Sequence, residues 1–308
     1  MEKTQTKPVF FEKTSFRKKV KKAVIAAAGY GTRFLPQTIA MPKEMLPIVR
    51  KPVIQFIVEE AISAGVEDIV IVTGRTKRAV ENHFDRNKEL EEVLRTSGKI
   101  ERLERISHIP NMANFIYLRQ KGPMGNATPI LNAEPIIAKE PFFYLFGDDF
   151  IEAQPSRCQQ LLSAFEKFPG QILSALRTKK KEDTFKYAFA SGKEVAPGII
   201  RVENIIEKPG PEKTPSDLAI VSGFLFTPKI IEAIKALPEP EVGDELVYVD
   251  ALRLLIKDGE PVYALEIKNG KYHDCGNVLE YMKTTVEFAL KDPEIKEEFL
   301  QFLKNLIK

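Results

Sequence analysis

The sequence predicts an α/β protein whose Rossmann-like sheet is mixed, mostly parallel and flanked by helices. Apolar runs without polar alternation, beginning with residues 24–28, recur between segments whose apolar residues repeat at helical spacing. Such runs are typical of strands that are covered on both faces. Glycines or acidic residues follow several of these runs. We therefore expect a ligand site beyond the carboxyl ends of the strands, where open sheets of this class bind their ligands.

In the first half of the chain, strands and helices alternate. After the strand at 24–28, a helix begins near Pro52 and ends before Gly65, and a second strand covers 69–72. This strand–helix–strand unit should have a right-handed crossover. The elements expected next are a helix at 77–84, an amphipathic helical excursion at 87–106, a strand at 115–118, a glycine-containing turn at 120–127 that leads into a helix, and a strand at 142–146.

The second half is less regular, and we expect its strands to complete the sheet of the first half because no repeat or low-complexity linker separates the two. The expected helices cover 155–168, 230–236, 245–257, 277–290 and 293–307, the strands cover 172–177, 199–207, 218–226 and 262–267, and turns or loops cover 179–183, 209–215 and 271–276. Residues 21–290 should form one domain whose halves meet near residue 150. A basic arm at 1–20 precedes it, and a C-terminal helix at 291–308 follows it.

The composition argues against several classes of protein. The 46 basic and 43 acidic residues give a net charge of +3, so no overall field favours nucleic acid or an anionic membrane as a partner. No apolar run is long enough to span a membrane. Cys158 and Cys275 are too few for a disulfide framework and are typical of free thiols in the cytoplasm. Only the basic arm would support a nucleic-acid-binding module, and we expect that arm to be a solvated terminus.

The stretch after the first strand has the composition of a triphosphate-binding loop. Gly29 and Gly31 allow a sharp turn and a close approach of the backbone to a ligand. Thr32, Arg33 and Lys43 can donate hydrogen bonds to phosphate oxygens. Two glycines alone would equally fit a tight turn with a solvated arginine, so this interpretation depends on the rest of the chain.

Two further pairs of polar residues follow expected strands. Asp148 and Asp149 come directly after the strand at 142–146, where carboxylate oxygens suit Mg²⁺ together with phosphates and water. The alternative is an acidic turn that closes the strand. Glu207 and Lys208 end a later strand, and such a pair can bind sugar hydroxyls and a phosphate, although it is more often an exposed strand exit.

Several sequence blocks together indicate a family. In chain order they are G-x-G-T-R-F-L-P at 29–36, P-K-E-M-L-P at 42–47, E-N-H-F-D at 81–85, the turn at Gln120, G-D-D at 147–149, E-K-P at 207–209 and H-D-C-G at 273–276. From about Lys21 to Leu290, the chain resembles the bacterial-type UTP:glucose-1-phosphate uridylyltransferases, or UDP-glucose pyrophosphorylases, of the sugar nucleotidyltransferase superfamily. The resemblance implies the nucleotide-diphospho-sugar transferase fold, with a nucleotide-binding half at 21–150 and a sugar-binding half at 151–290.

The resemblance implies an enzyme that converts UTP and glucose 1-phosphate to UDP-glucose and pyrophosphate, with Mg²⁺ as cofactor and no covalent enzyme intermediate. It implies catalytic roles for Arg33, Lys43 and Lys208, and metal ligation by Asp148 and Asp274. The substrate-binding residues that it implies are Ala28, Gly29, Gly31, Thr32, Glu44, Gln120, Gly125, Asp149, Glu207 and Gly223. The expected partners are the two small-molecule substrates and further copies of the chain in a cytoplasmic homo-oligomer.

Departures from the family pattern leave the nucleobase and the sugar open. Ile39 stands where the family has a lysine, and Ala127, Thr128 and Pro129 replace a glycine, a histidine and an alanine in the base-binding turn. A thymidylyltransferase, or another sugar-1-phosphate nucleotidyltransferase, is therefore the alternative among enzymes. A catalytically weak regulatory paralogue that binds UDP-glucose is the alternative outside them.

Overall fold

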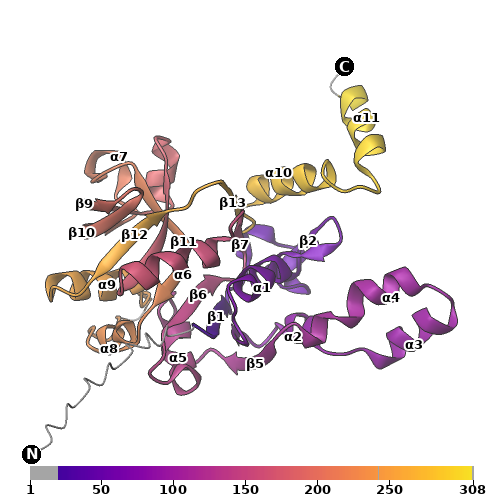
Figure 1. The fold of residues 1–308 in the computed structure, drawn as a ribbon, viewed down its shortest axis with the longest axis horizontal. Coiled ribbons are helices and arrows are strands. Elements are labelled where there is room, and N and C mark those ends of the chain that lie inside the picture. Colours follow the sequence, from indigo (N-terminus) through magenta and orange to yellow (C-terminus); the bar gives the residue numbers. More distant parts are fainter. Residues whose placement is uncertain (1–19, 242, 307–308) are drawn as a thin grey trace, which may run out of the picture.

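A computed structural model of the chain describes residues 20–241 and 243–306, so the predicted basic arm, except for Val20, lies outside the described residues. A nine-stranded sheet in the order β5-β4-β1-β6-β11-β8-β12-β10-β9 runs through the molecule (Figure 1). Strands from both halves of the sequence thus form one sheet, as expected. They are β1 (Lys22–Ala27), β4 (Asp68–Thr73), β5 (Asn114–Arg119), β6 (Phe142–Phe146), β8 (Gln171–Arg177), β9 (Ala188–Ala196), β10 (Ile199–Glu207), β11 (Leu218–Phe226) and β12 (Val262–Glu266).

The sheet is mixed, in agreement with the predicted fold class. Neighbours among β5, β4, β1 and β6 are parallel, and β12 is parallel to β8. β11 is antiparallel to β6 and β8, and β10 is antiparallel to β12 and β9. β10 and β11 therefore run opposite to the other strands of this sheet. The carboxyl ends of β1, β4, β5 and β6 consequently lie at one edge.

Helices cover both faces of the sheet because alternate side chains of a strand point to opposite faces. Val24 and Tyr144 pack on one face with α5, α8 and α9, whereas Ile25 and Leu145 pack on the other face with α1 and α6. All four side chains are buried, which explains the absence of polar alternation in these strands. The helices are α1 (Val53–Ser63), α2 (Arg78–Phe84), α3 (Lys88–Thr96), α4 (Ile100–Ser107), α5 (Thr128–Ile137), α6 (Arg157–Lys167), α7 (Gly210–Lys213), α8 (Lys229–Lys235), α9 (Tyr248–Lys257), α10 (Val278–Ala289) and α11 (Lys296–Leu306).

Some expectations of local structure are wrong. The expected turn at 271–276 contains most of β13 (Gly270–Asp274), which pairs antiparallel with the unexpected strand β7 (Asp149–Ala153). Neither strand is a purely apolar run, so its composition does not distinguish it from a loop. Each strand is stabilised by pairing with a segment that is distant in the sequence. β9 was not expected either: its first three residues are buried and apolar, but exposed residues at 192–195 interrupt the apolar pattern. α7 lies in the expected loop at 209–215. A short hairpin, β2 (Pro47–Ile48) and β3 (Lys51–Pro52), completes the strands.

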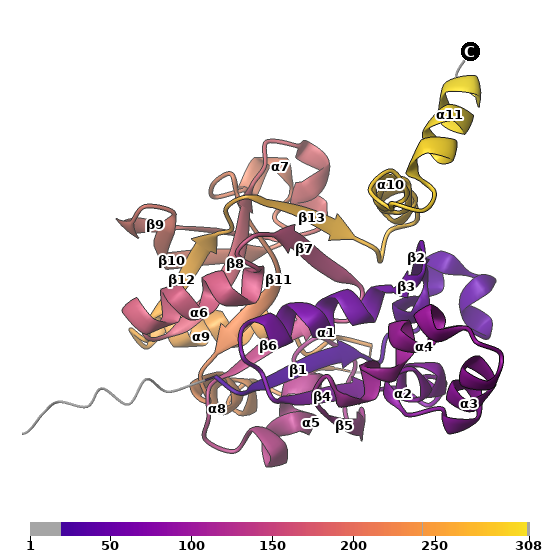
Figure 2. The same cartoon turned by 45° about the vertical axis from the view of Figure 1, so that its right-hand side comes forward.

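Two helical pairs extend from the body of the molecule (Figures 1 and 2). The excursion expected at 87–106 consists of α3 and α4, which are separated at Gly98, where φ is +70° and the backbone is left-handed. The second pair is α10 and α11, and no residue of α11 is buried. Within the described part of the chain, no helix has the length and hydropathy of a membrane span.

Candidate active site

A cavity of about 1160 Å³ opens at the carboxyl ends of the parallel strands. Its wall includes the glycine loop after β1, Gly74 after β4, Gln120 after β5 and Asp148 after β6. Glu207 at the end of β10 and Asp274 at the end of β13 also belong to the wall. The cavity therefore lies where this fold class binds ligands, and it brings together residues from both halves of the chain.

The loop after β1 is held in a tight turn. Gly31 adopts a left-handed conformation with φ +68°, and its carbonyl accepts hydrogen bonds from the amide of Phe34 at 3.0 Å and the hydroxyl of Thr38 at 2.8 Å. Lys43 lies on a short 3-10 turn that follows. A Cβ at Gly29 would lie 3.6 Å from Lys43 Nζ, so the ammonium faces the backbone of the loop. The loop thus offers backbone amides and a cation to one anionic ligand.

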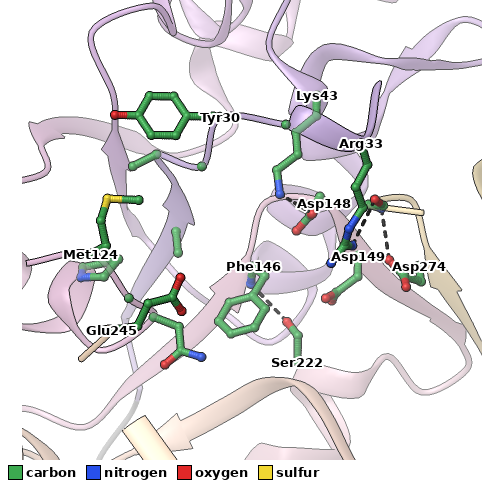
Figure 3. Close-up of a pocket in the computed structure, with 18 of the residues that line it drawn as sticks. Tyr30, Arg33, Lys43, Met124, Phe146, Asp148, Asp149, Ser222, Glu245 and Asp274 are labelled. Atoms are coloured by element: carbon green, nitrogen blue, oxygen red, sulfur yellow. Dashed lines mark hydrogen bonds and ion pairs between the residues drawn. The ribbon is translucent and has the colours of Figure 1, made fainter. Parts of the chain in front are cut away.

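Opposite charges meet beyond the end of β6 (Figure 3). Lys43 Nζ lies 2.5 Å from Oδ2 of Asp148. Arg33 donates from Nη1 to the carbonyl of Gly276 at 3.2 Å, and the amide of Gly276 donates to Oδ1 of Asp274 at 3.1 Å. A Cβ at Gly276 would overlap the carboxylate of Asp148 and lie 3.2 Å from Asp274 Oδ1. Both carboxylates therefore lie against this glycine, with two cations beside them.

The crowding of carboxylates is visible in their pKa values. Burial raises the pKa of Asp274, and the neighbouring carboxylate of Asp148 raises it further. Burial also raises the pKa of Asp149, although the guanidinium of Arg157 opposes this shift. For Lys43, burial disfavours the charged form, but nearby carboxylates, chiefly Asp148, raise its pKa overall. Additional positive charge would therefore be favourable at this point of the wall.

Asp148 and Asp274 have the chemistry and the arrangement to hold a magnesium ion. Their carboxylates share the space that the missing side chain of Gly276 leaves open. Mg²⁺ commonly binds one or two carboxylates and takes its remaining ligands from phosphates and water. Among residues 20–241 and 243–306, no group of three or more His, Cys, Asp or Glu side chains forms a complete cage for a metal ion. The remaining ligands of such an ion would thus come from a bound phosphate and water.

The turn after β5 is held by the backbone of Leu246. The amide of Leu246 donates to the carbonyl of Met124 at 2.8 Å, and its carbonyl accepts from the amide of Ala127 at 3.0 Å. Gly125 has φ +129°, and a Cβ there would overlap the carbonyl oxygen of Leu246. The side-chain oxygen of Asn126 accepts a hydrogen bond at 2.9 Å from the first amide of α9. The turn is therefore rigid and can present backbone groups to a flat ligand such as a nucleobase.

Glu207 and Lys208 belong to the wall of the same cavity and are not a plain strand exit. Lys208 has φ +44°, which is unusual for a residue with a side chain, and its amide donates to the carbonyl of Tyr187 at 3.2 Å. Its Nζ lies 3.7 Å from Oε1 of Glu207, and burial raises the pKa of that glutamate. The rings of Tyr187 and Tyr272 meet edge to face, with centroids 6.0 Å apart, and both line the cavity. Glu207 and Lys208 thus share this part of the cavity wall with two tyrosine rings.

Comparison with known proteins agrees with this geometry. Residues 22–290 match the nucleotidyl transferase family. The chain belongs to this family. Its relatives include a UTP–glucose-1-phosphate uridylyltransferase of Staphylococcus haemolyticus, which is 43% identical over 94% of this chain and 99% of the relative. The resemblance found in the sequence is confirmed.

Solved structures of similar proteins share the fold. A UDP-glucose pyrophosphorylase complexed with UDP-glucose is 37% identical, with a TM-score of 0.80 over 89% of this chain and 100% of that chain. A UTP-bound enzyme of the same kind from Acinetobacter baumannii is 30% identical, with a TM-score of 0.84 over 93% of this chain and 99% of that chain. The mixed α/β architecture of this nucleotidyl transferase is therefore that of the UDP-glucose pyrophosphorylases.

Most of the predicted site residues line the cavity of this nucleotidyl transferase. They are Ala28, Gly29, Gly31, Thr32, Arg33, Lys43, Gln120, Gly125, Asp148, Asp149, Glu207, Lys208 and Asp274. The structure brings these positions together, and their individual roles toward substrate and metal stay predictions.

Two predicted substrate-binding residues, Glu44 and Gly223, do not line the cavity. Glu44 is fully buried, and its two carboxylate oxygens accept hydrogen bonds from the ammonium of Lys77 at 3.0 and 2.7 Å. Gly223 faces the buried guanidinium of Arg157, which occupies the space where a side chain would lie. The structure thus gives both residues internal packing contacts outside the cavity wall, and their roles at the substrate stay predictions.

The departures from the family pattern differ in their surroundings. Ile39 is 72% exposed and lies outside the cavity wall, so its side chain does not occupy the cavity. Thr128 is buried, and its hydroxyl donates to the carbonyl of Pro123 at 2.7 Å. Pro129 lines the cavity. The altered turn is therefore closed by its own side-chain hydrogen bond.

Sequence reasoning missed several residues of the wall, among them Arg75, Tyr187, Ser222, Tyr248 and Tyr272. Single tyrosines and serines inside apolar patterns look the same whether they face a core or a cavity. Arg75 could have been found, because it follows Gly74 directly after β4 and thus lies at the carboxyl edge of the sheet.

Proposed function

We propose that this chain transfers a uridylyl group from UTP to glucose 1-phosphate, forming UDP-glucose and pyrophosphate. The observation that carries this proposal is one cavity in which a cationic glycine loop, a rigid backbone turn, two facing carboxylates and a Glu–Lys pair all meet. Each of these features suits a different part of the two substrates. The 43% identity to a UTP–glucose-1-phosphate uridylyltransferase supports the proposal independently.

In the proposed reaction, an oxygen of the phosphate of glucose 1-phosphate forms a bond to the α-phosphorus of UTP. The bond between that phosphorus and the oxygen that bridges to the β-phosphate breaks, and pyrophosphate leaves. Such a displacement depends on alignment and on compensation of negative charge more than on proton transfer. The backbone after β1 and the side chains of Arg33 and Lys43 would hold the triphosphate. The turn around Gly125 and the side chain of Gln120 would orient the uracil.

On the sugar side, Lys208 would bind the phosphate of glucose 1-phosphate, and Glu207 would accept hydrogen bonds from its hydroxyl groups. The left-handed backbone at Lys208 and the hydrogen bond of its amide to the carbonyl of Tyr187 fix this residue in the cavity wall, from which its side chain can reach a bound phosphate. Asp148 and Asp274 would hold Mg²⁺, which when bound would offset the negative charge of the phosphates.

Release of pyrophosphate from pairs of a nucleoside triphosphate and a sugar phosphate tests the proposal. We expect turnover with UTP and glucose 1-phosphate and loss of this turnover when EDTA removes divalent cations. Rapid turnover with dTTP but none with UTP would instead make the chain a thymidylyltransferase. Binding of UDP-glucose without turnover of any pair would favour a regulatory paralogue.

We also propose that the chain forms a homo-oligomer through α11. This helix buries none of its residues, yet it exposes Leu300, Phe302 and Leu306 to solvent. A helix of this length is marginally stable in water without packing of an apolar face, and α11 extends from the body of the molecule (Figure 2). Light scattering should show a smaller assembly for a variant that combines Phe302→Glu with Leu306→Glu, and no change for Lys304→Glu on the same helix. A wild-type monomer would contradict the proposal.

A further inference from the structure

A buried ion cluster lies directly behind the cavity wall. Arg157, the first residue of α6, has no exposed surface, and its guanidinium binds Glu60 of α1 through Nε–Oε1 and Nη2–Oε2 contacts of 2.8 Å each. Its Nη1 donates to the carbonyl of Ser222 and lies 3.5 Å from Oδ1 of Asp149. Ser222 and Asp149 both line the cavity. Arg157 therefore links two residues of the wall to a helix behind it.

Stability alone does not explain this cluster. Bringing charges out of water costs free energy that their attraction often fails to recover, and apolar residues of similar volume frequently give an equally stable protein. A guanidinium, however, carries its donors in a rigid plane and can fix several acceptors at set angles. Here it joins α1, the start of β7 and the middle of β11. These contacts fix the positions of α1, β7 and β11 relative to one another.

The same guanidinium supports a bulge in β11. The register of β11 on β8 shifts between Ile220 and Phe224, and Gly223 within this stretch has φ +100°. A Cβ at Gly223 would lie 2.5 Å from both Cδ and Nε of Arg157. The arginine thus fills the space beside the bulge, and only glycine fits opposite it.

The bulge in turn holds the end of the strand that precedes the acidic pair Asp148 and Asp149. Ser222 Oγ accepts a hydrogen bond at 3.1 Å from the amide of Phe146, the last residue of β6. The bulge is also close to Glu207. Ile220, next to the bulge, lies opposite Ala188 of β9, and Ala188 lies opposite Glu207 of β10. Among the hydrogen bonds of the described residues, Arg157 makes none with the loops after β1 and β5.

We propose that Arg157 is a positioning residue for the sugar-phosphate part of the substrate. It holds Asp149 and the bulge at Ser222 and Gly223 in the places from which they shape the hexose side of the cavity. The nucleotide loops are independent of it. This inference rests on the proposed function, since it assumes that the hexose phosphate occupies the region of Glu207.

The test compares the affinities for UDP-glucose and for UTP, measured by titration calorimetry so that turnover is not required. In Arg157→Met, we expect the affinity for UDP-glucose to fall roughly tenfold or more, the usual effect of losing a supporting contact behind a site, while the affinity for UTP changes little. Arg157→Lys keeps the charge but loses the planar contacts of the guanidinium. We expect a smaller fall in the affinity for UDP-glucose, again with little change in the affinity for UTP.

Two further variants separate positioning from folding. Arg157→Met combined with Glu60→Leu removes the guanidinium together with the carboxylate that it binds at 2.8 Å, so we expect a smaller loss of thermal stability than in Arg157→Met, together with the same loss of affinity for UDP-glucose. Arg177→Met, which removes only exposed ion pairs with Asp217 and Glu266, is the control and should change neither affinity.

Either of two results would overturn the inference: wild-type affinity for UDP-glucose in the folded double variant, or equal losses for both ligands. If the double variant does not fold, Arg157→Lys decides, and unchanged affinity for UDP-glucose in that variant overturns the inference. A wild-type protein that binds UTP but not UDP-glucose would overturn the proposed function instead, which keeps the two failures distinct.

Discussion

Replacing Gly125 by alanine tests whether the rigid turn after β5 binds the nucleobase. A Cβ at this position would overlap the carbonyl oxygen of Leu246 and lie 2.5 Å from its amide nitrogen. Both are backbone atoms, so neither can rotate away as a side chain would. The φ of +129° is also unfavourable for alanine. The turn in Gly125→Ala must therefore move away from Leu246.

The size of the effect follows from the contacts that are lost. The hydrogen bonds between Leu246 and the backbones of Met124 and Ala127 would break, at about 1 kcal/mol each. Restoring the native turn around a base would also require the strained conformation, at about 1–3 kcal/mol. Together these terms come to about 3–5 kcal/mol, and about 1.4 kcal/mol corresponds to a factor of ten. We therefore expect the KM for UTP to rise on the order of 10²–10⁴-fold.

Initial rates of pyrophosphate release, with UTP varied at saturating glucose 1-phosphate, measure this change. Gly259→Ala is the matched control, because Gly259 has φ +77° but no atom within 4 Å of a Cβ. It carries the left-handed strain without the overlap, far from the turn, and should leave the KM for UTP unchanged. A KM for UTP in Gly125→Ala close to that of the wild type would refute the role of this turn.

Three further substitutions test other parts of the molecule. Asp148→Asn should lower turnover by a factor on the order of 10²–10³ in a folded protein, because it removes the carboxylate that pairs with Lys43 and is assigned to Mg²⁺; wild-type rates would contradict this assignment. Lys208→Ala should raise the KM for glucose 1-phosphate about 10–100-fold through loss of a charged hydrogen bond, with the KM for UTP little changed; equal increases would contradict its role. His83→Gln addresses stability, because burial lowers the pKa of His83, so the unfolded state binds more protons and the free energy of unfolding falls as the pH drops below about 6.5. Urea titrations between about pH 7.5 and pH 5.5 should show a smaller fall for this variant than for the wild type, and an equal fall would contradict the shift.

The features that could be predicted from the sequence are those encoded by neighbouring residues. β1, β4, β6 and β11 are apolar runs, so their composition alone distinguishes them from helices and loops. The glycine loop was likewise readable, because Gly29, Gly31 and Arg33 lie next to one another in the chain. β7 and β13 could not be predicted, because each contains polar residues and is stabilised by pairing with the other strand, which is distant in the sequence.

Glu44 and Gly223 are the two predicted site residues that lie outside the cavity wall. Glu44 lies in the P-K-E-M-L-P block and Gly223 was assigned from the resemblance alone, and a resemblance does not reveal which residues face the ligand. Glu44 instead neutralises the buried ammonium of Lys77, and Gly223 makes room for Arg157. Neither partner is near in the sequence, so the sequence offered no reason to separate these two residues from the cavity.

The amino-acid sequence alone determined three features: the covered parallel strands, the loop after β1 and the family. Each of them depends on the composition and order of residues that are close together in the chain. The tertiary structure decided which residues meet. It placed Asp274 beside Asp148 through the pairing of β13 with β7, and it placed Arg157 behind Asp149 through the packing of α6 against β11. These contacts join segments that are far apart in the chain, so they are determined by how the whole sheet and its helices pack and not by any local pattern.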